Sequence, residues 1–376
     1  MPLSNHLGQP LPTSRRGVLR SAAGAPLLLL PHAPRVHAAA AATAKPVLDQ
    51  PMRRLRLPKG TVGRDYVLLQ LKLGGQGPFD FVVDTGLTAE LITPHLKQVL
   101  SLRSDKVLET GLGAGGGVGN MELVTLKDAV LVGAEGIDLP PLNAVVTDFV
   151  QEHMDPEHDP VEGMLGMELL QQFDVDFDFP AGRIRFFNPG EGVAMAGAAG
   201  LVNVPAAVLN ETGVLGIRTT SPKSSSGQPF VGMLDCGASF SALNWQAAAL
   251  AGLPPRGDPS YGQLAKGQGV AIIGMDGKPQ VLPTTEVQFT FAGAASKEAD
   301  GRYRFEAPPA AWKPWQPVLA AVGDLPVFAQ LFGDGRTPFS GPAALLGLDV
   351  LSQRRVVIGA GVGAKGRARP LLVSPA

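Results

Sequence analysis

The sequence predicts an all-β protein built from two related lobes. Short apolar segments, partly alternating and bounded by Gly or Pro, are typical of strands, and one ordered set of landmarks occurs twice along the chain. Gly (47) and Pro (34) together exceed a fifth of the 376 residues without a collagen-like period, which indicates many turns. The clearest predicted strands are Val67–Leu73, Phe79–Val83, Val124–Val132 and Arg183–Phe187, and the clearest predicted helices are His95–Leu102, Met167–Phe173 and Trp245–Ala251.

The composition excludes several classes of protein. Hydrophobic residues make up 45% of the chain and charged residues 17%, which suits filled cores and argues against a disordered protein. A net charge of -1 gives no long-range attraction to nucleic acid or to anionic membranes. Cys236 is the single cysteine, so no disulfide can form within the chain, and the fold must rest on its cores.

The first 48 residues contain no acidic residue and have the features of an export signal. Ser14–Arg20 carries the pair Arg15-Arg16, a modest apolar run reaches Leu30, and Val36–Ala38 suits a cleavage site. We expect a twin-arginine signal that directs the chain to a thylakoid lumen, with a bacterial periplasm as the alternative. An Ala-rich tail with a chance arginine pair is the other interpretation. The apolar run is too short to span a bilayer, so we expect no membrane span in the mature chain.

The internal repeat defines the domain organisation. Each copy has an apolar strand ending in Asp, a Gly-rich stretch, and a closing apolar-apolar-Gly element. In the first copy these are Pro78–Gly86, Gly111–Gly119 and Met164–Leu170, and in the second they are Pro229–Gly237, Gly267–Gly277 and Leu345–Leu351. The spacing predicts a first lobe over 52–190, a linker over 191–202 and a second lobe over 203–376.

The second copy is longer than the first. Asp84 lies 82 positions before Gly166, whereas Asp235 lies 112 positions before Gly347, a difference of thirty. The polar, Pro-rich stretch Glu298–Gln316 is the predicted insertion. Its two tryptophans, Trp312 and Trp315, either form a lid or partner contact or pack on their own lobe.

The repeat carries a pair of carboxyl groups, Asp84 and Asp235. Each follows an apolar strand and precedes a small residue and a Gly, which permits close approach of the opposite loop. Two carboxyl groups about 3 Å apart cannot both ionise, so the pair shares one proton. The ionised member can take a proton from water while the protonated member supports the carbonyl oxygen under attack. We therefore predict Asp84 and Asp235 as catalytic residues that need no metal and no cofactor.

The tandem motifs Asp84-Thr85-Gly86 and Asp235-Cys236-Gly237, each with its later Leu-Gly element, resemble those of the aspartic proteases, and most closely the retropepsin-like group. The resemblance covers about Tyr66 to Ile358. It implies an acid protease fold of two β-barrel-like lobes related by a pseudo-twofold axis, with an apolar cleft between them and an acidic optimum. It also implies that Thr85, Gly86, Cys236 and Gly237 shape the active-site loops.

The resemblance further implies a flap over the substrate, assigned to Gly113, Gly115, Gly116 and Gly117 in the first Gly-rich stretch. The implied activity is that of an endopeptidase acting on polypeptides, and a monomer could be active because one chain supplies both aspartates. The alternative is a catalytically weak or inactive protein that keeps the fold and binds peptides. A third possibility is a protease confined to its own maturation.

The sequence departs from the family pattern at three positions. Cys236 stands where Thr or Ser is usual, Leu87 follows the first Gly, and Glu168 stands where the second copy has Asp349. Cys236 invites a redox role, although a buried thiol of raised pKa is the simpler interpretation.

Two other groups allow a functional and a plainer interpretation. His153 and His158 lie among acidic residues and could bind a metal, but a solvated polar loop is the favoured interpretation. The run Gly115–Gly117 lacks the Lys-Ser/Thr sequel of a phosphate-binding loop.

Overall fold

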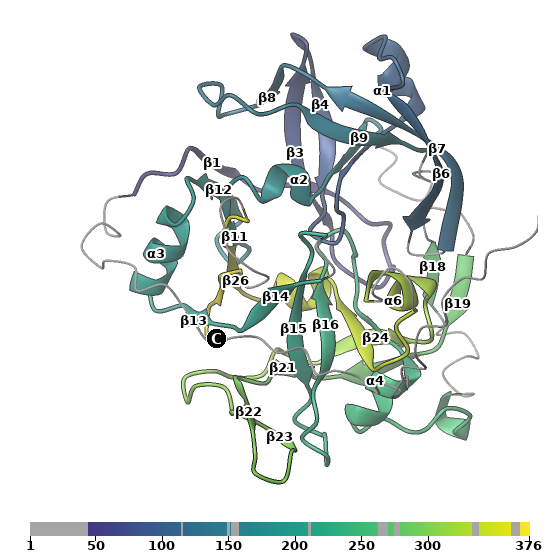
Figure 1. Ribbon diagram of the computed structural model, residues 1–376, viewed down its shortest axis with the longest axis vertical. Coiled ribbons are helices and arrows are strands. Elements are labelled where there is room, and N and C mark those ends of the chain that lie inside the picture. The colour runs from purple at the N-terminus through teal and green to yellow at the C-terminus, as the bar shows by residue number, and fades with distance from the viewer. Residues whose placement is uncertain are drawn as a thin grey trace, which may run out of the picture.

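The computed structural model describes residues 44–113, 116–148, 151, 158–209, 212–261, 270–273, 279–332, 338–361 and 369–376. It confirms the predicted all-β, two-lobed fold: strands dominate, helices are short, and the lobes lie one above the other in Figure 1. Most of the predicted export signal, Gly115 of the predicted flap, and His153 lie outside the described residues.

The first lobe is a twisted sheet whose strands run in the order β2-β3-β4-β10-β5-β9-β7-β6, with β8 paired to β3. Its elements are β2 (Arg53–Leu55), β3 (Tyr66–Leu73), β4 (Gln76–Val83), β5 (Glu90–Ile92), α1 (Pro94–Val99), β6 (Lys106–Gly113), β7 (Gly116–Leu126), β8 (Ala129–Leu131), β9 (Leu142–Val146), β10 (Gly163–Leu165) and α2 (Met167–Leu170). Phe81, Val82 and Val83 at the end of β4 are buried, so the apolar sequence before Asp84 anchors this strand in the core.

The second lobe repeats this plan, with the strand order β14-β15-β16-β25-β17-β24-β20 and β21 paired to β15. Its elements are β14 (Ala206–Val208), β15 (Leu215–Thr220), β16 (Phe230–Leu234), β17 (Ala242–Leu243), α4 (Trp245–Leu250), β18 (Val270–Ile273), β19 (Pro279–Leu282), β20 (Thr284–Val287), β21 (Thr290–Phe291), β22 (Ala295–Lys297), β23 (Tyr303–Phe305), β24 (Val318–Val322), α6 (Pro326–Leu331), β25 (Ala343–Leu346) and α7 (Leu348–Leu351). Within the described residues both lobe sheets are open, which differs from the closed barrels that "β-barrel-like" would suggest.

The strand pairings of the two lobes match around each aspartate. β10 runs parallel to β4 and antiparallel to β5, and β25 runs parallel to β16 and antiparallel to β17. The helices that follow β5 and β17, α1 and α4, are capped in the same way. Thr93 Oγ1 accepts from Leu96 N (3.0 Å), and Asn244 Oδ1 accepts from Ala247 N (2.9 Å). The duplication seen in the sequence is therefore a duplication of topology.

A third sheet joins the lobes, in the order β1-β12-β11-β26-β27-β13. Its strands are β1 (Leu48–Pro51), β11 (Asp174–Asp178), β12 (Arg183–Phe187), β13 (Val202–Asn203), β26 (Arg355–Ile358) and β27 (Leu371–Val373). Each lobe supplies three of these described strands, and the central pair, β11 and β26, is antiparallel. The helix α3 (Glu191–Ala198) lies against this sheet (Figure 1).

A buried ion cluster crosses the centre of this interlobe sheet. Asp176 on β11 has a fully buried side chain, and both its oxygens accept from Arg355 on β26, at 2.9 and 2.8 Å. Arg185 on β12 donates to the same carboxylate at 3.0 Å. Because Asp176 and Arg355 belong to different lobes, this cluster ties the halves together.

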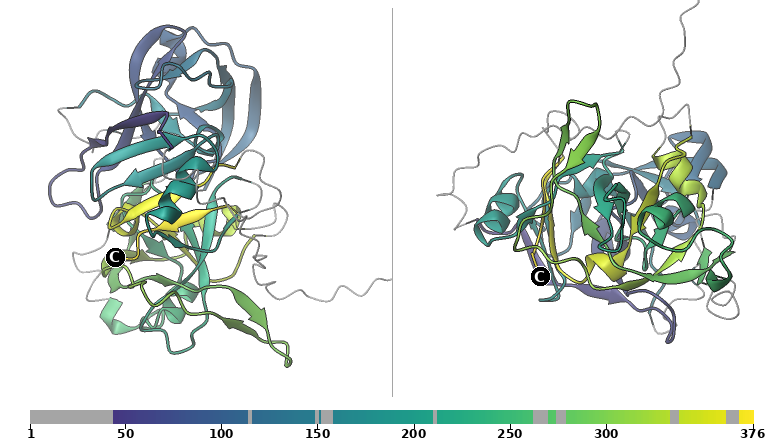
Figure 2. Two further views of the ribbon diagram at one scale, coloured as in Figure 1. Left: turned by 90° about the vertical axis from the view of Figure 1, so that its left-hand side faces the viewer. Right: turned by 90° about the horizontal axis from the view of Figure 1, so that it is seen from below.

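Several segments differ in detail from the sequence prediction. The predicted strand Val124–Val132 is two strands, β7 and β8, because Asp128 adopts a left-handed conformation (φ 51°) between them. The predicted linker, 191–202, holds α3, and β1 begins at Leu48, ahead of the predicted first lobe. The hairpin of β22 and β23 overlaps the predicted insertion and projects from the second lobe (Figure 2). Among the described helices, none is long and apolar enough to cross a membrane.

Candidate active site

The structure places Asp84 and Asp235 at the ends of matching strands, β4 and β16. Asp84 N donates to Leu165 O at 2.9 Å, and Asp235 N donates to Leu346 O at 3.1 Å. These carbonyls belong to the Leu-Gly elements that close each repeat. In both lobes, the apolar-apolar-Gly element thus fixes the start of the aspartate loop through a backbone hydrogen bond.

Gly86 and Gly237 allow the two loops to come together. A Cβ added to Gly86 would lie 2.6 Å from Asp235 Cγ, and one added to Gly237 would collide with the Asp84 carboxyl group. Gly86 N donates to Asp84 Oδ1 at 2.8 Å, and Gly237 N donates to Asp235 Oδ1 at 2.9 Å. Each carboxyl group also affects the pKa of the other. The structure therefore brings the predicted pair together, and each lobe's glycine lies beneath the other lobe's aspartate.

The middle residues of the two loops form a reciprocal set of hydrogen bonds across the lobes. Thr85 Oγ1 accepts from Cys236 N (3.0 Å) and donates to Leu234 O (3.1 Å). Cys236 Sγ accepts from Thr85 N (3.4 Å) and donates to Val83 O (3.2 Å). The thiol thus makes the same two kinds of contact as the hydroxyl, at the longer distances that sulfur requires. The departure from Thr at position 236 does not break the link between the loops.

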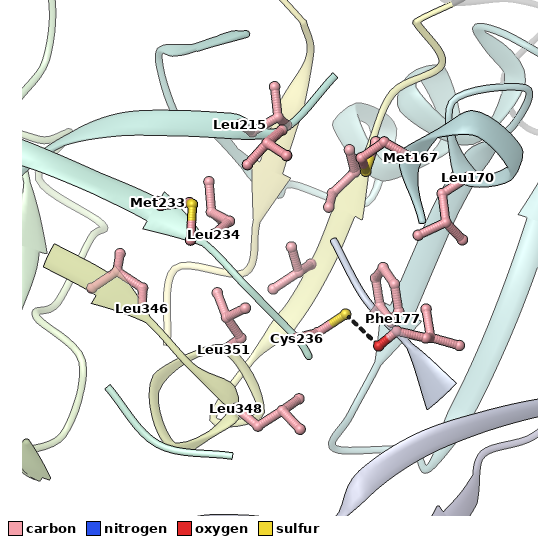
Figure 3. Close-up of a cluster of buried hydrophobic side chains, with 14 of the residues drawn as sticks. Met167, Leu170, Phe177, Leu215, Met233, Leu234, Cys236, Leu346, Leu348 and Leu351 are labelled. Carbon is pink, nitrogen blue, oxygen red and sulfur yellow. Dashed lines mark hydrogen bonds between the residues drawn. The ribbon is translucent and has the colours of Figure 1, made fainter. Parts of the chain in front are cut away.

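Cys236 is buried in an apolar cluster that includes Met167, Leu170 and Phe177, and its hydrogen bond is the dashed line in Figure 3. Burial is the main reason why the pKa of this thiol is raised above its usual value, and the charge of Asp84 raises it further. The thiolate is the reactive form of cysteine, so this environment favours the plainer of the two interpretations, a structural thiol.

Burial sets the electrostatics of the two aspartates. Removal from water raises the pKa of both carboxyl groups, and the charge of Asp84 raises the pKa of Asp235 further, well above its usual range. Asp235 is 9% exposed, and Asp84 is half-buried. Simultaneous ionisation of both carboxyl groups is therefore disfavoured, and the pair holds one proton between them.

The two lobes differ in the carboxylate that accepts hydrogen bonds from the backbone of the short helix after each Leu-Gly element, α2 in the first lobe and α7 in the second. In the second lobe Asp349 accepts from Ser241 N, Ser241 Oγ and Val350 N at 2.6–3.0 Å. In the first lobe the position of Ser241 is taken by Glu90, which is fully buried and accepts from Leu169 N at 2.9 Å. Glu168, at the position of Asp349, instead accepts from Asn143. Glu90 thus supplies the backbone hydrogen bond at the start of α2 that Asp349 supplies at the start of α7.

Glu90 should make the protein less stable as the pH rises. Burial raises the pKa of Glu90 from 4.5 to about 8, so between these values the folded protein holds a proton that the unfolded chain releases. The free energy of unfolding then falls with rising pH by up to about 1.4 kcal/mol per unit. We expect Glu90→Gln to reduce the loss of stability between pH 5 and pH 8 by about 4 kcal/mol, measured by urea unfolding. Glu286→Gln, at an exposed glutamate of the second lobe, is the control and should leave the loss unchanged. An equal loss in wild type and Glu90→Gln would contradict this assignment.

The Gly-rich stretch predicted as a flap is a hairpin formed by β6 and β7. Gly113 pairs with Gly116, and Leu112 pairs with Gly117. A corresponding hairpin of β18 and β19 occurs in the second lobe. Closure on a substrate stays a prediction.

The remaining candidate residues have structural contacts. Trp312 and Trp315 are buried in the second lobe and pack edge to face, and the Arg354 guanidinium lies 4.2 Å from the Trp312 ring centroid. Packing on the lobe therefore describes them better than a lid. His158 Nε2 lies 3.6 Å from Asp80 Oδ2. Within the described part of the chain no cluster of three or more His, Cys, Asp or Glu side chains could hold a metal.

Sequence reasoning missed Tyr66 and Ser239, which lie beside the aspartates. Tyr66 begins β3, and burial together with the charges of Asp235 and Asp84 raises the pKa of its phenol. Two residues earlier, Arg64 N donates to Ser239 O at 2.9 Å, four residues after Asp235. The scarcity of tyrosine, with three in the whole chain, was the available signal.

Comparison with known proteins gives a consistent result. The family described as aspartyl protease matches residues 69–169, which include the Asp84 loop and the first Leu-Gly element. A solved retropepsin-like aspartic protease from Rickettsia conorii is similar at 18% identity over 37% of this chain and 89% of that one, with a TM-score of 0.24. No curated protein matches the chain.

The family match makes the first lobe similar to an aspartyl protease and suggests a peptide hydrolase. The predicted resemblance to the aspartic proteases is therefore supported over residues 69–169.

Proposed function

We propose that the protein is an aspartic endopeptidase in which Asp84 and Asp235 act together on one water molecule. The main support for this proposal is that the two loops meet: Gly86 and Gly237 each lie against the carboxyl group of the opposite lobe. The reciprocal bonds of Thr85 and Cys236 fix this arrangement from both lobes. Preorganised groups of this kind are what general acid–base catalysis requires.

The proposed reaction divides the roles by protonation. Asp84, the ionised member, takes a proton from water as its oxygen attacks the carbonyl carbon of the peptide bond. Asp235 gives its proton to the carbonyl oxygen, which forms a neutral tetrahedral diol. In the second step Asp84 delivers its proton to the leaving nitrogen, and a hydroxyl proton of the diol returns to Asp235 as the C–N bond breaks. Water is consumed, the dyad is restored, and no covalent intermediate forms.

The direct test is cleavage of a denatured protein by the purified chain as a function of pH, with and without a statine-type inhibitor. We expect inhibitor-sensitive cleavage between about pH 4 and pH 6 and a bell-shaped profile. Protonation of Asp84 removes the base at low pH, and loss of the Asp235 proton removes the acid at high pH. Because the pKa of Asp235 lies well above that of an exposed carboxyl group, the alkaline limb should lie well above pH 4.

Cleavage that the inhibitor leaves untouched would belong to a contaminant. Absence of cleavage at every pH would favour the alternative, a peptide-binding protein without catalysis.

We also propose export by the twin-arginine route, to a thylakoid lumen or alternatively a periplasm, and activity as a monomer. The export proposal is supported by the acid-free first 48 residues with their arginine pair. The monomer is supported by the supply of both aspartates from one chain. Sequencing the mature N-terminus in the native compartment tests the first proposal, and the molecular mass in solution tests the second.

A further inference from the structure

Four hydrogen bonds join the segment from Asp84 to Glu90 to the closing element of the first repeat. At the start of the segment, Asp84 N donates to Leu165 O at 2.9 Å, and at its end Glu90 Oε1 accepts from Leu169 N at 2.9 Å. The bond to Glu90 depends on a side chain, whereas the others join backbone atoms, so it alone can change with a proton. The two bonds between them run from Met167 N to Leu87 O (2.8 Å) and from Glu168 N to Thr88 O (3.1 Å).

The carboxyl group of Glu90 lies in the core with one oxygen unpaired. Glu90 is fully buried, and within the described residues its Oε2 has no hydrogen-bond partner. A buried carboxylate needs partners for both oxygens, because no water is there to solvate the charge. The neutral acid carries a proton instead of a charge and keeps Oε1 as the acceptor for Leu169 N. The hydrogen bonding of Glu90 therefore suits its protonated form.

Among the described elements packed against β5, none presents a positive charge to Glu90. The paired strands β9 and β10 carry no titratable side chain, and α2 carries Glu168 alone. Burial is the main reason why the pKa of Glu90 rises from 4.5 to about 8, and the negative charge of Glu168 raises it further. The link from β5 to α2 is therefore in its favoured form at acidic pH, and the charge on Glu90 opposes it as the pH passes about 8.

The second lobe makes the same connection with a carboxylate that has more partners. Ser241, at the position of Glu90, accepts from Gly347 N at 3.0 Å and donates to Asp349 Oδ1 at 2.6 Å. Asp349 Oδ2 accepts from Ser241 N at 3.0 Å, so both carboxylate oxygens are hydrogen-bonded. Burial raises the pKa of Asp349, and these hydrogen bonds act against that rise. The second lobe thus gives its carboxylate the partners that the first lobe does not.

We propose that Glu90 is a positioning residue for Asp84 that works as a neutral acid, and that its ionisation loosens the first aspartate loop at alkaline pH. This inference rests on the proposed function. Ionisation favours hydration of Oε2, and water can reach this buried oxygen only if a packed neighbour moves. The short helix α2 is the neighbour that the Glu90 side chain itself holds.

Movement of α2 would reach the catalytic loop directly. The helix also donates to Leu87 O and Thr88 O, and Leu165, two residues before it, accepts from Asp84 N. Loosening these bonds displaces the base of the proposed reaction. The position of a base matters more in the transition state than in the bound ground state, so kcat should fall more than KM rises.

The structural test is hydrogen exchange followed by mass spectrometry, on peptides covering residues 165–170 and 346–351. After correction for the intrinsic effect of pH on exchange, protection of wild-type α2 should fall by up to about tenfold per pH unit above about pH 8. Glu90→Gln is neutral at every pH and keeps an oxygen acceptor for Leu169 N, so its α2 should keep constant protection. Residues 346–351 of the second lobe are the internal control and should keep their protection in both proteins.

The kinetic test compares Glu90→Gln with Glu90→Ala at acidic pH, where Glu90 is neutral. We expect Glu90→Gln to keep kcat within about twofold of wild type, and Glu90→Ala to lower kcat about three- to tenfold with little change in KM, the effect of one hydrogen bond. Rescue by glutamine would show that the neutral acceptor, and not the charge, positions the loop.

An equal pH response of α2 in wild type and Glu90→Gln would overturn the proposal. A parallel loss of protection in both lobes of the wild type would do the same, since it would indicate global unfolding. Wild-type kcat in Glu90→Ala, or an equal loss of kcat in Glu90→Gln, would refute the positioning role. Should the wild-type chain cleave nothing, the proposed function fails, while the exchange data still decide whether the ionisation of Glu90 releases α2.

Discussion

Replacing Asp84 by Asn, or Asp235 by Asn, is expected to lower the rate of peptide cleavage by at least about 10²- to 10⁴-fold, the usual contribution of a positioned acid or base. Asparagine has nearly the shape of aspartate, so each loop keeps its acceptor for the Gly86 or Gly237 N–H. It cannot take a proton from water at position 84 or supply one at position 235. Both variants should be nearly inactive, because each residue performs half of the proton transfer.

Stability separates this loss of chemistry from a loss of fold. The raised pKa of each aspartate means that its ionisation opposes folding, so the carboxyl groups favour the folded state at low pH and lose that contribution as pH rises. Neutral Asn avoids this cost, and both variants should therefore melt no lower than wild type at pH 7. Asp80→Asn on the same strand removes a carboxylate that pairs with Arg53 at the surface, and it should leave cleavage intact. Full activity in either dyad variant would end the proposed mechanism.

Asp176→Asn is expected to lower the free energy of unfolding by up to about 3–5 kcal/mol, since it removes the fully buried carboxylate that Arg355 and Arg185 share and leaves them only the less buried Asp178. Asp176 is fully buried and binds Arg355 through both oxygens, and Arg185 shares one of them. Because β11 and β26 come from different lobes, the loss should appear as weaker coupling between the lobes. Urea unfolding followed by fluorescence measures it.

The matched control is Asp49→Asn in the same interlobe sheet. Asp49 pairs with Arg183 at 2.8 Å and also with Arg185 at 3.3 Å. Asp49 and Arg183 are more than a third exposed, so this substitution should cost no more than about 1 kcal/mol. Equal effects of the two substitutions would show that burial of Asp176 contributes nothing to the interlobe sheet.

The parts of the fold that local sequence determines were predictable. An apolar strand followed by Asp, a small residue and Gly is a contiguous pattern, and its second occurrence at Asp235 announced the second lobe. The Leu-Gly elements were found in the same way, although the sequence did not show that Leu165 O and Leu346 O receive the aspartate N–H groups.

The features that escaped prediction depend on partners far apart in the chain. Arg355 and Asp176 are separated by 179 positions, and Arg64 and Ser239 belong to different lobes. By residue type alone, a thiol at position 236 is a weaker hydrogen-bonding group than the usual hydroxyl. In the structure, Cys236 still bonds to both Thr85 N and Val83 O. The sequence shows Glu90 in the first copy at the position of Ser241 in the second. Only the structure shows that Glu90 is buried and can therefore take over a structural role.

The unequal halves bear on how a substrate could be oriented. A polypeptide has a direction from amino to carboxyl end, whereas a perfectly twofold-related pair of loops has none and would accept a chain equally well either way round. Because both lobes are encoded in one chain, each can carry different residues beside its aspartate, as Glu90 in the first lobe and Ser241 in the second illustrate. Such an enzyme can place its acid on a fixed side of the scissile bond, and so bind its substrate in only one chain direction.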